Sequence, residues 1–184
     1  MHNLSRLLLL CSLIVSSVGC DQATKAIANA AIGSGPALSY FGDTVRLTYA
    51  ENPGGFLSVG ATLPPLLRSL LFGVIPAVVV IGLMIPLVRN RSLTRAEGIA
   101  LALIVSGALG NLIDRLALGA VRDFLNVGIG PLRSGIFNVA DVAVTGGVAI
   151  FCFLAITTQT EPEPETVASH DTSPGARVDP PALP

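Results

Sequence analysis

The sequence predicts an all-α membrane protein with four transmembrane helices, a small extracytoplasmic β-rich cradle and a short interfacial helix. Of its 184 residues, 51% are hydrophobic and only 12% are charged, whereas soluble domains carry about 25% charged residues. The chain also contains long apolar runs that approach the roughly 20 residues a membrane-spanning helix requires. These runs are Leu7–Gly19, Leu70–Val88, Ile99–Leu112 and Val139–Thr157.

The number of spans and the basic residues together predict the orientation. The second and fourth runs are long enough to span, and the first and third need polar or small flanking residues to reach the interfaces. Four spans place both termini on one side of the membrane. Arg89, Arg91 and Arg95 crowd the second connection and Arg6 precedes the first span. Because basic residues favour the cytoplasmic side, we expect both termini in the cytoplasm.

The first and third connections predict the cradle. Residues 43–58, "DTVRLTYAENPGGFLS", alternate apolar and polar side chains and then reach an Asn-Pro-Gly-Gly sequence, which is typical of a strand followed by a turn. Residues 63–70, "LPPLLRSL", predict the short interfacial helix. The third connection contains another strand-like stretch at Val121–Val127.

The chain is predicted to have one folded part and a tail. Residues 1–157 form the four-helix membrane domain, and residues 158–184, rich in Pro, Glu, Ser and Thr, have the composition of a disordered, acidic tail. The three cysteines lack metal-type spacing and both histidines lie near the termini, so we expect no metal and no cofactor. No aromatic and basic surface indicates nucleic-acid binding.

Polar residues gather around the same ends of the four predicted spans. Ionisable groups inside a bilayer cost about 2.5–3.5 kcal/mol each at a central position, so such a cluster needs compensation or a role. Asp21 and Lys25 follow the first span, Asn52 lies in the first connection, Asn111, Asp114 and Arg115 end the third span, Asp123 follows it, and Asn138 and Asp141 open the fourth. All of them are predicted to lie on one side of the membrane.

Each of these residues also has a structural explanation when it is considered alone. Asn138 and Asp141 are suited to capping the fourth helix, and Asp114 to pairing with a basic neighbour. Arg115 and Arg122 suit an interface from which long side chains reach water. Asn52, beside Pro53 and Gly54, is an ordinary turn residue.

The combination of motifs is more specific. "GNLIDR" (110–115), "VRDF" (121–124) and "FNVADVAV" (137–144) occur in order, together with "DQATK" (21–25) and "ENPGG" (51–55). They resemble the lipoprotein signal peptidase family, also called signal peptidase II, over residues 4–157. The resemblance implies a polytopic aspartyl endopeptidase of the bacterial cytoplasmic membrane that needs no cofactor. Its substrates are diacylglyceryl-modified prolipoproteins, cut just before the lipidated cysteine.

One stretch departs from the family pattern. The family commonly has Asn-x-Gly-Ala-Ala-Phe in the first connection, whereas this chain has Asn52-Pro53-Gly54-Gly55-Phe56. Asn52 and Gly54 match the pattern. The displaced phenylalanine and the additional glycine alter the expected conformation of the loop and its substrate contacts.

An aspartyl peptidase requires two carboxyl groups that share a proton, and three aspartates compete for the two places. Asp141 opens a predicted helix, where local donors orient a carboxylate, and its partner is either Asp114 or Asp123. Asp114 lies beside Arg115, which favours a permanently ionised structural carboxylate. Strand alternation turns the neighbours of Asp123 to the opposite face, which leaves Asp123 free to face Asp141.

The resemblance implies Asp123 and Asp141 as the catalytic pair. It also implies that the following residues shape or stabilise the site: Asp21, Lys25, Asn52, Gly54, Asn111, Asp114, Arg115, Asn138 and Ala140. The expected surroundings of the enzyme are membrane lipids and prolipoprotein substrates, and we expect a monomer with its active site at the extracytoplasmic face.

Two other interpretations compete with this one. A small four-span ion or solute transporter would use the aspartates as ligands, although transporter sites usually lie near the bilayer midplane. Alternatively, the "SSVGC" sequence that ends at Cys20 resembles a lipoprotein cleavage site, which would make this protein a substrate. Ser17 stands where such a site usually has leucine, and cleavage would remove the first of the four spans.

Overall fold

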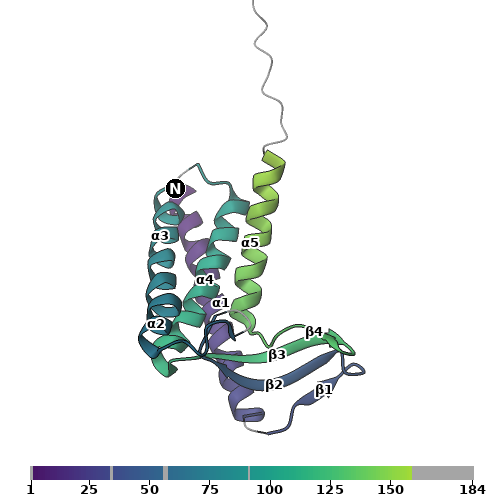
Figure 1. Ribbon diagram of the computed structural model, residues 1–184. Helices are drawn as coiled ribbons and strands as arrows, with labels where there is room; N and C mark the ends of the chain where they lie inside the picture. Colours follow the sequence, from purple (N-terminus) through teal and green to yellow (C-terminus); the bar gives the residue numbers. More distant parts are fainter. Residues whose placement is uncertain (1, 34, 56–57, 91, 159–184) are drawn as a thin grey trace, which may run out of the picture.

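The computed structural model describes residues 2–33, 35–55, 58–90 and 92–158. Its elements are α1 (His2–Ala31), β1 (Leu38–Tyr40), β2 (Val45–Asn52), α2 (Pro65–Ser69), the π-helical turn η2 (Leu70–Val74), α3 (Ile75–Arg89), α4 (Arg95–Leu118), β3 (Val121–Ile129), β4 (Leu132–Arg133) and α5 (Val139–Thr158). The helices form a bundle, and the strands form a small sheet at one end of it (Figure 1). This arrangement confirms the predicted fold class.

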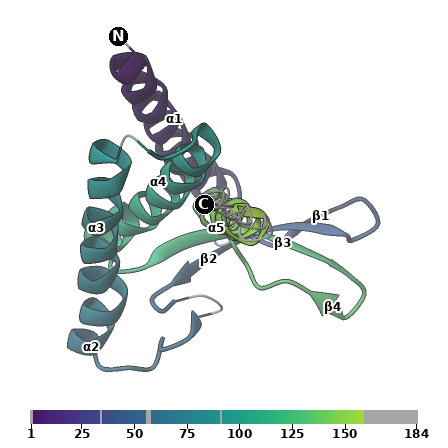
Figure 2. The same cartoon turned by 90° about the horizontal axis from the view of Figure 1, so that it is seen from above.

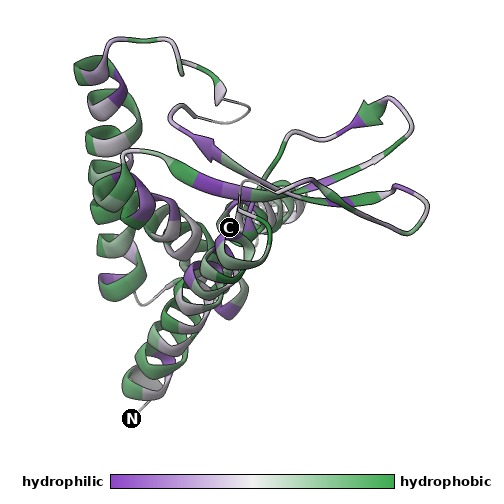
Figure 3. Ribbon diagram, turned by 90° about the horizontal axis from the view of Figure 1, so that it is seen from below, coloured by the Kyte–Doolittle hydropathy of each residue, from purple (hydrophilic) through white to green (hydrophobic). Residues whose placement is uncertain are grey.

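Four of the described helices are long and apolar enough to cross a membrane. They cover Leu4–Ala31, Pro65–Arg89, Arg95–Leu118 and Val139–Thr157. Hydrophobic residues predominate along these helices (Figure 3), and many of their side chains are exposed, for example Val78 and Ile81 of α3. In a bilayer these side chains face lipid.

The most buried of the four spans is α4, which packs between α1, α3 and α5. Thr94 and Glu97 form a reciprocal capping box at its start, with the Thr94 amide 2.7 Å from Glu97 Oε2. At its end, Gly119 adopts φ 76°, a left-handed conformation that suits glycine. Small residues allow α4 and α5 to approach closely, because a Cβ atom on Gly107 would lie 2.2 Å from the Ala140 carbonyl oxygen.

The first helix is longer than its apolar run predicted. We expected the first span to end near Gly19 and to be followed by Asp21 and Lys25, but α1 continues to Ala31. Residues 20–32 contain neither proline nor glycine and are rich in alanine, a composition that favours helix. Asp21 and Lys25 therefore lie within the helix, one turn apart, and not in the connection that follows it.

The predicted short helix forms as α2, but it is continuous with the second span. It runs through η2 directly into α3, and Pro65–Arg89 acts as one apolar helix. The π turn immediately precedes Pro76, whose ring lacks an N–H and would clash with the carbonyl group four residues earlier in a regular α-helix. A π turn is a common way to insert such a residue without ending the helix.

The strands of the sheet are antiparallel, in the order β1-β2-β3-β4. The predictions of strands around residues 45–49 and 121–127 are thus confirmed. Val45 pairs with Val127 and Ala50 with Asp123, with an irregularity of register between Leu47 and Ala50. Phe124 of β3 packs on Ala28 of α1, so the C-terminal part of α1 supports the sheet.

Both ends of the described chain lie at the end of the bundle opposite the sheet (Figure 1). Arg6 and Asn90 also meet at that end, where Arg6 Nη1 donates to the Asn90 carbonyl oxygen at 3.1 Å. The sheet extends sideways past α5, away from α3 (Figure 2). The predicted tail is outside the described residues apart from Thr158.

Candidate active site

A buried cluster of ion pairs joins α1, α4 and β3 at the sheet end of the bundle. Lys25 Nζ lies 2.8 Å from Asp21 Oδ2 and 3.1 Å from Asp114 Oδ2. Arg122 Nη2 lies 2.6 Å from Asp114 Oδ1. Asp21, Lys25 and Asp114 are at most 1% exposed. Each charge is compensated by an opposite one, which is the condition for burying ionised groups.

The hydrogen-bond and ion-pair partners of Asp114 come from α1 and from β3, and its sequence neighbour Arg115 is not among them. The Arg122 amide also donates to Asp114 Oδ2, at 3.0 Å. Gln22 fills the remaining space, because its Nε2 donates to Asp114 Oδ1 at 3.2 Å and its Oε1 accepts from Arg122 Nη2 at 2.9 Å. Arg122 is therefore a pairing residue of this cluster, although its side chain remains 17% exposed.

Asp21 connects this cluster to the start of α5. Its Oδ1 accepts from the Ala140 amide at 2.9 Å, one of the amides at the first turn of a helix that lack intrahelical partners. Gly110 lies against the same carboxylate, where a Cβ atom would be 2.6 Å from Asp21 Oδ2. A side chain at position 110 would push Asp21 away from α5. Gly110 and the small Ala140 thus allow α1, α4 and α5 to meet.

Asn138 and Asp141 form a reciprocal pair at the N-terminus of α5. The Asp141 amide donates to Asn138 Oδ1 at 3.0 Å, and the Asn138 amide donates to Asp141 Oδ2 at 3.1 Å. Asn111 Nδ2 donates to Asp141 Oδ1 at 2.8 Å. Both Asp141 oxygens thus accept hydrogen bonds, and these donors fix the orientation of the carboxyl group at the N-terminus of α5.

Lys25 determines which way the Asn111 amide faces. Its Nζ donates to Asn111 Oδ1 at 3.0 Å, and Asn138 Nδ2 donates to the same oxygen at 3.1 Å. With its oxygen held by two donors, Asn111 presents its NH₂ group to Asp141. The ion cluster and the Asp141 carboxylate are therefore parts of one hydrogen-bond network.

Asp123 projects from β3 toward Asn138 and Asn52. Asn138 Nδ2 donates to Asp123 Oδ1 at 2.6 Å, and Asn52 Nδ2 donates to Asp123 Oδ2 at 3.2 Å. Its neighbours Arg122 and Phe124 contact α4 and α1, in agreement with the alternation expected of a strand. Burial and the nearby Asp141 charge raise the pKa of Asp123 to about 6, although the two amide donors act in the opposite direction.

The turn after β2 brings a backbone carbonyl to Arg115. Arg115 Nη2 donates to the Gly54 carbonyl oxygen at 3.1 Å. Asn52 Oδ1 accepts from the Gly54 amide at 3.0 Å, and Asn52 Nδ2 donates to the Gly55 carbonyl at 3.0 Å. Gly54 has no room for a side chain, since a Cβ atom would lie 2.4 Å from the Val59 carbonyl oxygen. Phe56, the last residue of the stretch 52–56 that departs from the family pattern, lies outside the described residues.

Asp123 and Asp141 share a cavity of about 210 Å³, which we call the site cavity. Its lining comprises Asn52, Gly55, Asn111, Arg115, Val121, Asp123, Ile136, Asp141, Val144 and Thr145. Asp114 does not line it. Of the three aspartates considered from the sequence, only Asp123 and Asp141 are thus accessible from this cavity, whereas Asp114 is enclosed by its ion pairs.

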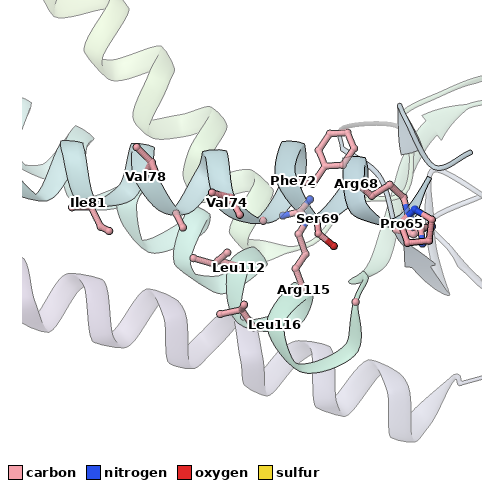
Figure 4. Close-up of a pocket in the computed structure, with 14 residues that line it drawn as sticks. Pro65, Arg68, Ser69, Phe72, Val74, Val78, Ile81, Leu112, Arg115 and Leu116 are labelled. Atoms are coloured by element: carbon pink, nitrogen blue, oxygen red, sulfur yellow. The ribbon is translucent and has the colours of Figure 1, made fainter. Parts of the chain in front are cut away.

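A larger apolar pocket of about 460 Å³ lies beside the site cavity, between α2–α3 and α4. In Figure 4 Phe72, Val74 and Val78 come from one wall, and Leu112, Arg115 and Leu116 from the other. Arg115 lines both spaces. A ligand with a polar part and an apolar part would fit across them.

The charges around the site are nearly balanced. Three cations, Lys25, Arg115 and Arg122, stand among the carboxyl groups of Asp21, Asp114, Asp123 and Asp141. A proton on one carboxyl group would make the cluster neutral, and Asp123, with its pKa raised to about 6, holds such a proton below that pH. Among the residues that the structure describes, no group of His, Cys, Asp or Glu is arranged to hold a metal ion.

The structure brings all the residues selected from the sequence into one region. They are Asp21, Lys25, Asn52, Gly54, Asn111, Asp114, Arg115, Asp123, Asn138, Ala140 and Asp141. Sequence reasoning missed Gln22 and the pairing role of Arg122. The helical continuation of α1 would have suggested Gln22, since it lies beside Asp21 and Lys25 on the same helix.

Comparison with known proteins agrees with this geometry. A family model for signal peptidase (SPase) II matches residues 13–157. The chain is 32% identical over 154 residues to the lipoprotein signal peptidase of Desulforapulum autotrophicum, covering 84% of this chain and 95% of that protein. It is 35% identical over 145 residues to the lipoprotein signal peptidase of Moorella thermoacetica, covering 79% of this chain and 89% of that protein.

The fold is also found in solved structures. Two bacterial membrane enzymes superpose with TM-scores of 0.75 and 0.70 at 25% and 26% identity. The matches cover 86% and 80% of this chain and 94% and 92% of those chains. The chain is therefore a multi-pass bacterial membrane peptidase that belongs to the signal peptidase II family.

Proposed function

We propose that this peptidase removes signal peptides from prolipoproteins by hydrolysing the peptide bond before a cysteine that already carries a diacylglyceryl group. The observation that carries the proposal is the pair of carboxyl groups, Asp123 and Asp141, bound by the same Asn138 in a cavity at one end of a membrane-spanning bundle. The transporter interpretation has no comparable support, because the family is one of peptidases.

In the proposed mechanism Asp141 is the general base and Asp123 the acid. Asp141 accepts hydrogen bonds from Asn111 and Asn138, which hold its carboxyl group in a fixed orientation toward the cavity. Asp123 carries the proton that the acid role requires at pH values below its raised pKa of about 6. Its Oδ2 receives the longer of its two hydrogen bonds, 3.2 Å from Asn52, and is the oxygen better placed to carry the proton.

The proton movements then balance over one turnover. Asp141 takes a proton from a water molecule as the water oxygen bonds to the scissile carbonyl carbon, and Asp123 gives its proton to the carbonyl oxygen. When the tetrahedral intermediate collapses, the C–N bond breaks and the leaving amine takes a proton from Asp141. The hydroxyl group that came from the carbonyl returns its proton to Asp123, which restores the starting state.

The apolar pocket favours the proposal that the substrate is lipid-modified. Its lining includes Phe72, Val78, Ile81, Leu112 and Leu116, and Arg115 links it to the site cavity. We infer that an acyl chain of the modified cysteine occupies this pocket while the scissile bond reaches Asp123 and Asp141. Because the acyl chain moves from the apolar bilayer into an apolar pocket and not from water, selection of modified precursors would depend on the fit of the chain to this pocket, which places the scissile bond at the two carboxyl groups.

We further infer that the site faces the extracytoplasmic side and that both termini are cytoplasmic. The basic residues Arg6, Arg89 and Arg95 lie in or beside helix ends remote from the sheet, where the positive-inside rule places the cytoplasm. The enzyme is proposed to act as a monomer, since every side chain assigned to the reaction comes from one chain.

The substrate proposal can be tested with one purified precursor in two forms. Wild-type enzyme in lipid nanodiscs would be mixed with a diacylglyceryl-modified precursor and, in a separate reaction, with the same precursor unmodified. Mass spectrometry should find a single cut directly before the cysteine in the modified precursor and at least a ~100-fold slower reaction of the unmodified one. Equal cleavage of both, or a cut elsewhere, would refute the proposed substrate class.

A further inference from the structure

The far end of the sheet carries an exposed apolar surface that the proposed reaction does not use. Phe41, Ile129 and Leu132 are 84%, 79% and 83% exposed, and Tyr40 is 46% exposed. They lie at the two hairpin ends, β1–β2 and β3–β4. We call these four residues the sheet tip. A cluster of exposed large apolar side chains is typical of a contact with a partner or a membrane.

The two hairpin ends are joined into one unit. The Gly128 amide donates to the Thr44 carbonyl oxygen at 2.9 Å. Arg133 Nη1 donates to the Asp43 carbonyl oxygen at 2.7 Å, and Arg133 Nε donates to Asn126 Oδ1 at 2.5 Å. The two hairpins that form the sheet tip are therefore held together by hydrogen bonds and are not independent loops.

The position of β3 determines the height of the tip relative to a bilayer. β3 begins at Val121, three residues after α4 ends at Leu118, so it leaves the bundle at the boundary of a membrane-spanning helix. The sheet then runs sideways from the bundle, and α1 continues past the level at which β3 leaves it (Figure 1). A strand that starts at the membrane boundary and runs across the bundle axis stays near the membrane surface.

The lateral reach of the sheet places the tip over lipid. The strands extend beyond α5, on the side where none of the described helices lies beneath them (Figure 2). Six residues separate Asp123 from Ile129, a distance of about 20 Å along the strand. The tip thus lies beside the bundle at the same boundary, adjacent to the lipid that contacts the apolar faces of α1 and α5.

We propose that the sheet tip inserts into the headgroup and acyl-chain boundary of the bilayer and holds the distal end of β3 at the membrane surface. Aromatic side chains such as Tyr40 and Phe41 favour this boundary. The contact is apolar and not electrostatic, because Asp43 pairs with both Arg46 and Arg133 and little net charge remains for anionic lipids. The proposal does not depend on the reaction at Asp123 and Asp141.

The absence of tryptophan from the chain makes a direct measurement possible. Phe41→Trp or Leu132→Trp introduces a single tryptophan, excited selectively at its own wavelength, at the tip of the full-length protein in phosphatidylcholine vesicles. Lipids brominated high on the acyl chain should quench it strongly, and aqueous iodide should quench it weakly. Ile81→Trp, on the exposed face of α3, is the lipid-facing control.

Three outcomes would overturn the proposal. Strong quenching by iodide with none by brominated lipid means that the tip lies in water. Weak quenching by both means that protein covers the tip. Loss of lipid quenching in high salt means that the contact is electrostatic.

A second variant strengthens the test: in the Phe41→Trp background, Leu132→Asp should reduce lipid quenching several-fold, whereas Leu132→Met should leave it unchanged.

Discussion

Asn138 Nδ2 lies 2.6 Å from Asp123 Oδ1, and this contact joins the sheet to the start of α5. The same asparagine exchanges two backbone-to-side-chain hydrogen bonds with Asp141. One residue therefore positions both carboxyl groups that line the site cavity, Asp123 through its side-chain amide and Asp141 through its backbone amide. Asn138 is itself fully buried, so its orientation is determined by the protein and not by solvent.

Asp114 is expected to stabilise the fold without taking part in the chemistry. It pairs with Lys25 and Arg122 and does not line the site cavity. Asp114→Asn removes one of the two partners of the buried Lys25 and the partner of the partly exposed Arg122, at a cost of about 3 kcal/mol. The variant should unfold at a clearly lower temperature in detergent. Its folded fraction should still cleave precursor at a rate within roughly tenfold of wild type. This loss is modest, because removal of a general acid or base lowers the rate by ~10²–10⁴-fold.

The matched control is Glu51→Gln, which neutralises an exposed carboxyl group of β2 and should change neither property. An Asp114→Asn protein with normal thermal stability and no cleavage would contradict the structural role assigned to Asp114.

Cleavage should become slower as the pH rises above about 6. Asp123 has a raised pKa of about 6 because of burial and the Asp141 charge, so it carries the required proton below that pH and loses it above. We expect a descending limb in kcat/KM, measured on modified precursor over roughly two pH units on either side of 6. A rate that rises steadily across this range would exclude Asp123 as the proton donor.

The contact between α1, α4 and α5 depends on the absence of a side chain at position 110. In Gly110→Ala the new Cβ would lie 2.6 Å from Asp21 Oδ2 and 3.2 Å from Ala140 Cβ, so we expect overpacking that costs about 1–3 kcal/mol. Thermal unfolding in detergent should detect it. Gly146→Ala, where nothing lies within 4 Å of the new atom, is the control and should be neutral or slightly stabilising. Equal stability of the two variants would refute this packing argument.

The start of α5 and the strand β3 could be predicted from the sequence because local chemistry determines them. "FNVAD" contains its own helix cap, since Asn138 and Asp141 have the spacing of a capping pair. The alternation around Asp123 likewise placed Arg122 and Phe124 on the opposite face. These inferences required only neighbouring residues.

The extent of α1 and the ion cluster could not be predicted in the same way. Asp21 and Lys25 look like residues outside a membrane helix, because a charge is unfavourable in a span unless it is compensated. Their compensation comes from Asp114, which is 89 residues after Lys25 in the chain. Only the tertiary structure reveals that these charges are paired, and thus that the helix continues through them.

The C-terminal tail is predicted to be dispensable for cleavage. The family match ends at residue 157, and every residue assigned to the site precedes it. A chain that ends at Gln159 should match the full chain in kcat/KM on modified precursor and in thermal stability. A several-fold loss of kcat/KM would show that the tail contributes to substrate binding or release.

The most direct test of the account is the cleavage of lipid-modified precursor by Asp123→Asn and Asp141→Asn, measured in single turnover with enzyme in excess. Each substitution preserves the shape of the side chain, and loss of a general acid or base lowers the rate by about 10²–10⁴-fold. We predict a loss of this size for both variants with thermal unfolding close to that of wild type. Undiminished cleavage by either variant would contradict the assignment of Asp123 and Asp141 as the catalytic pair.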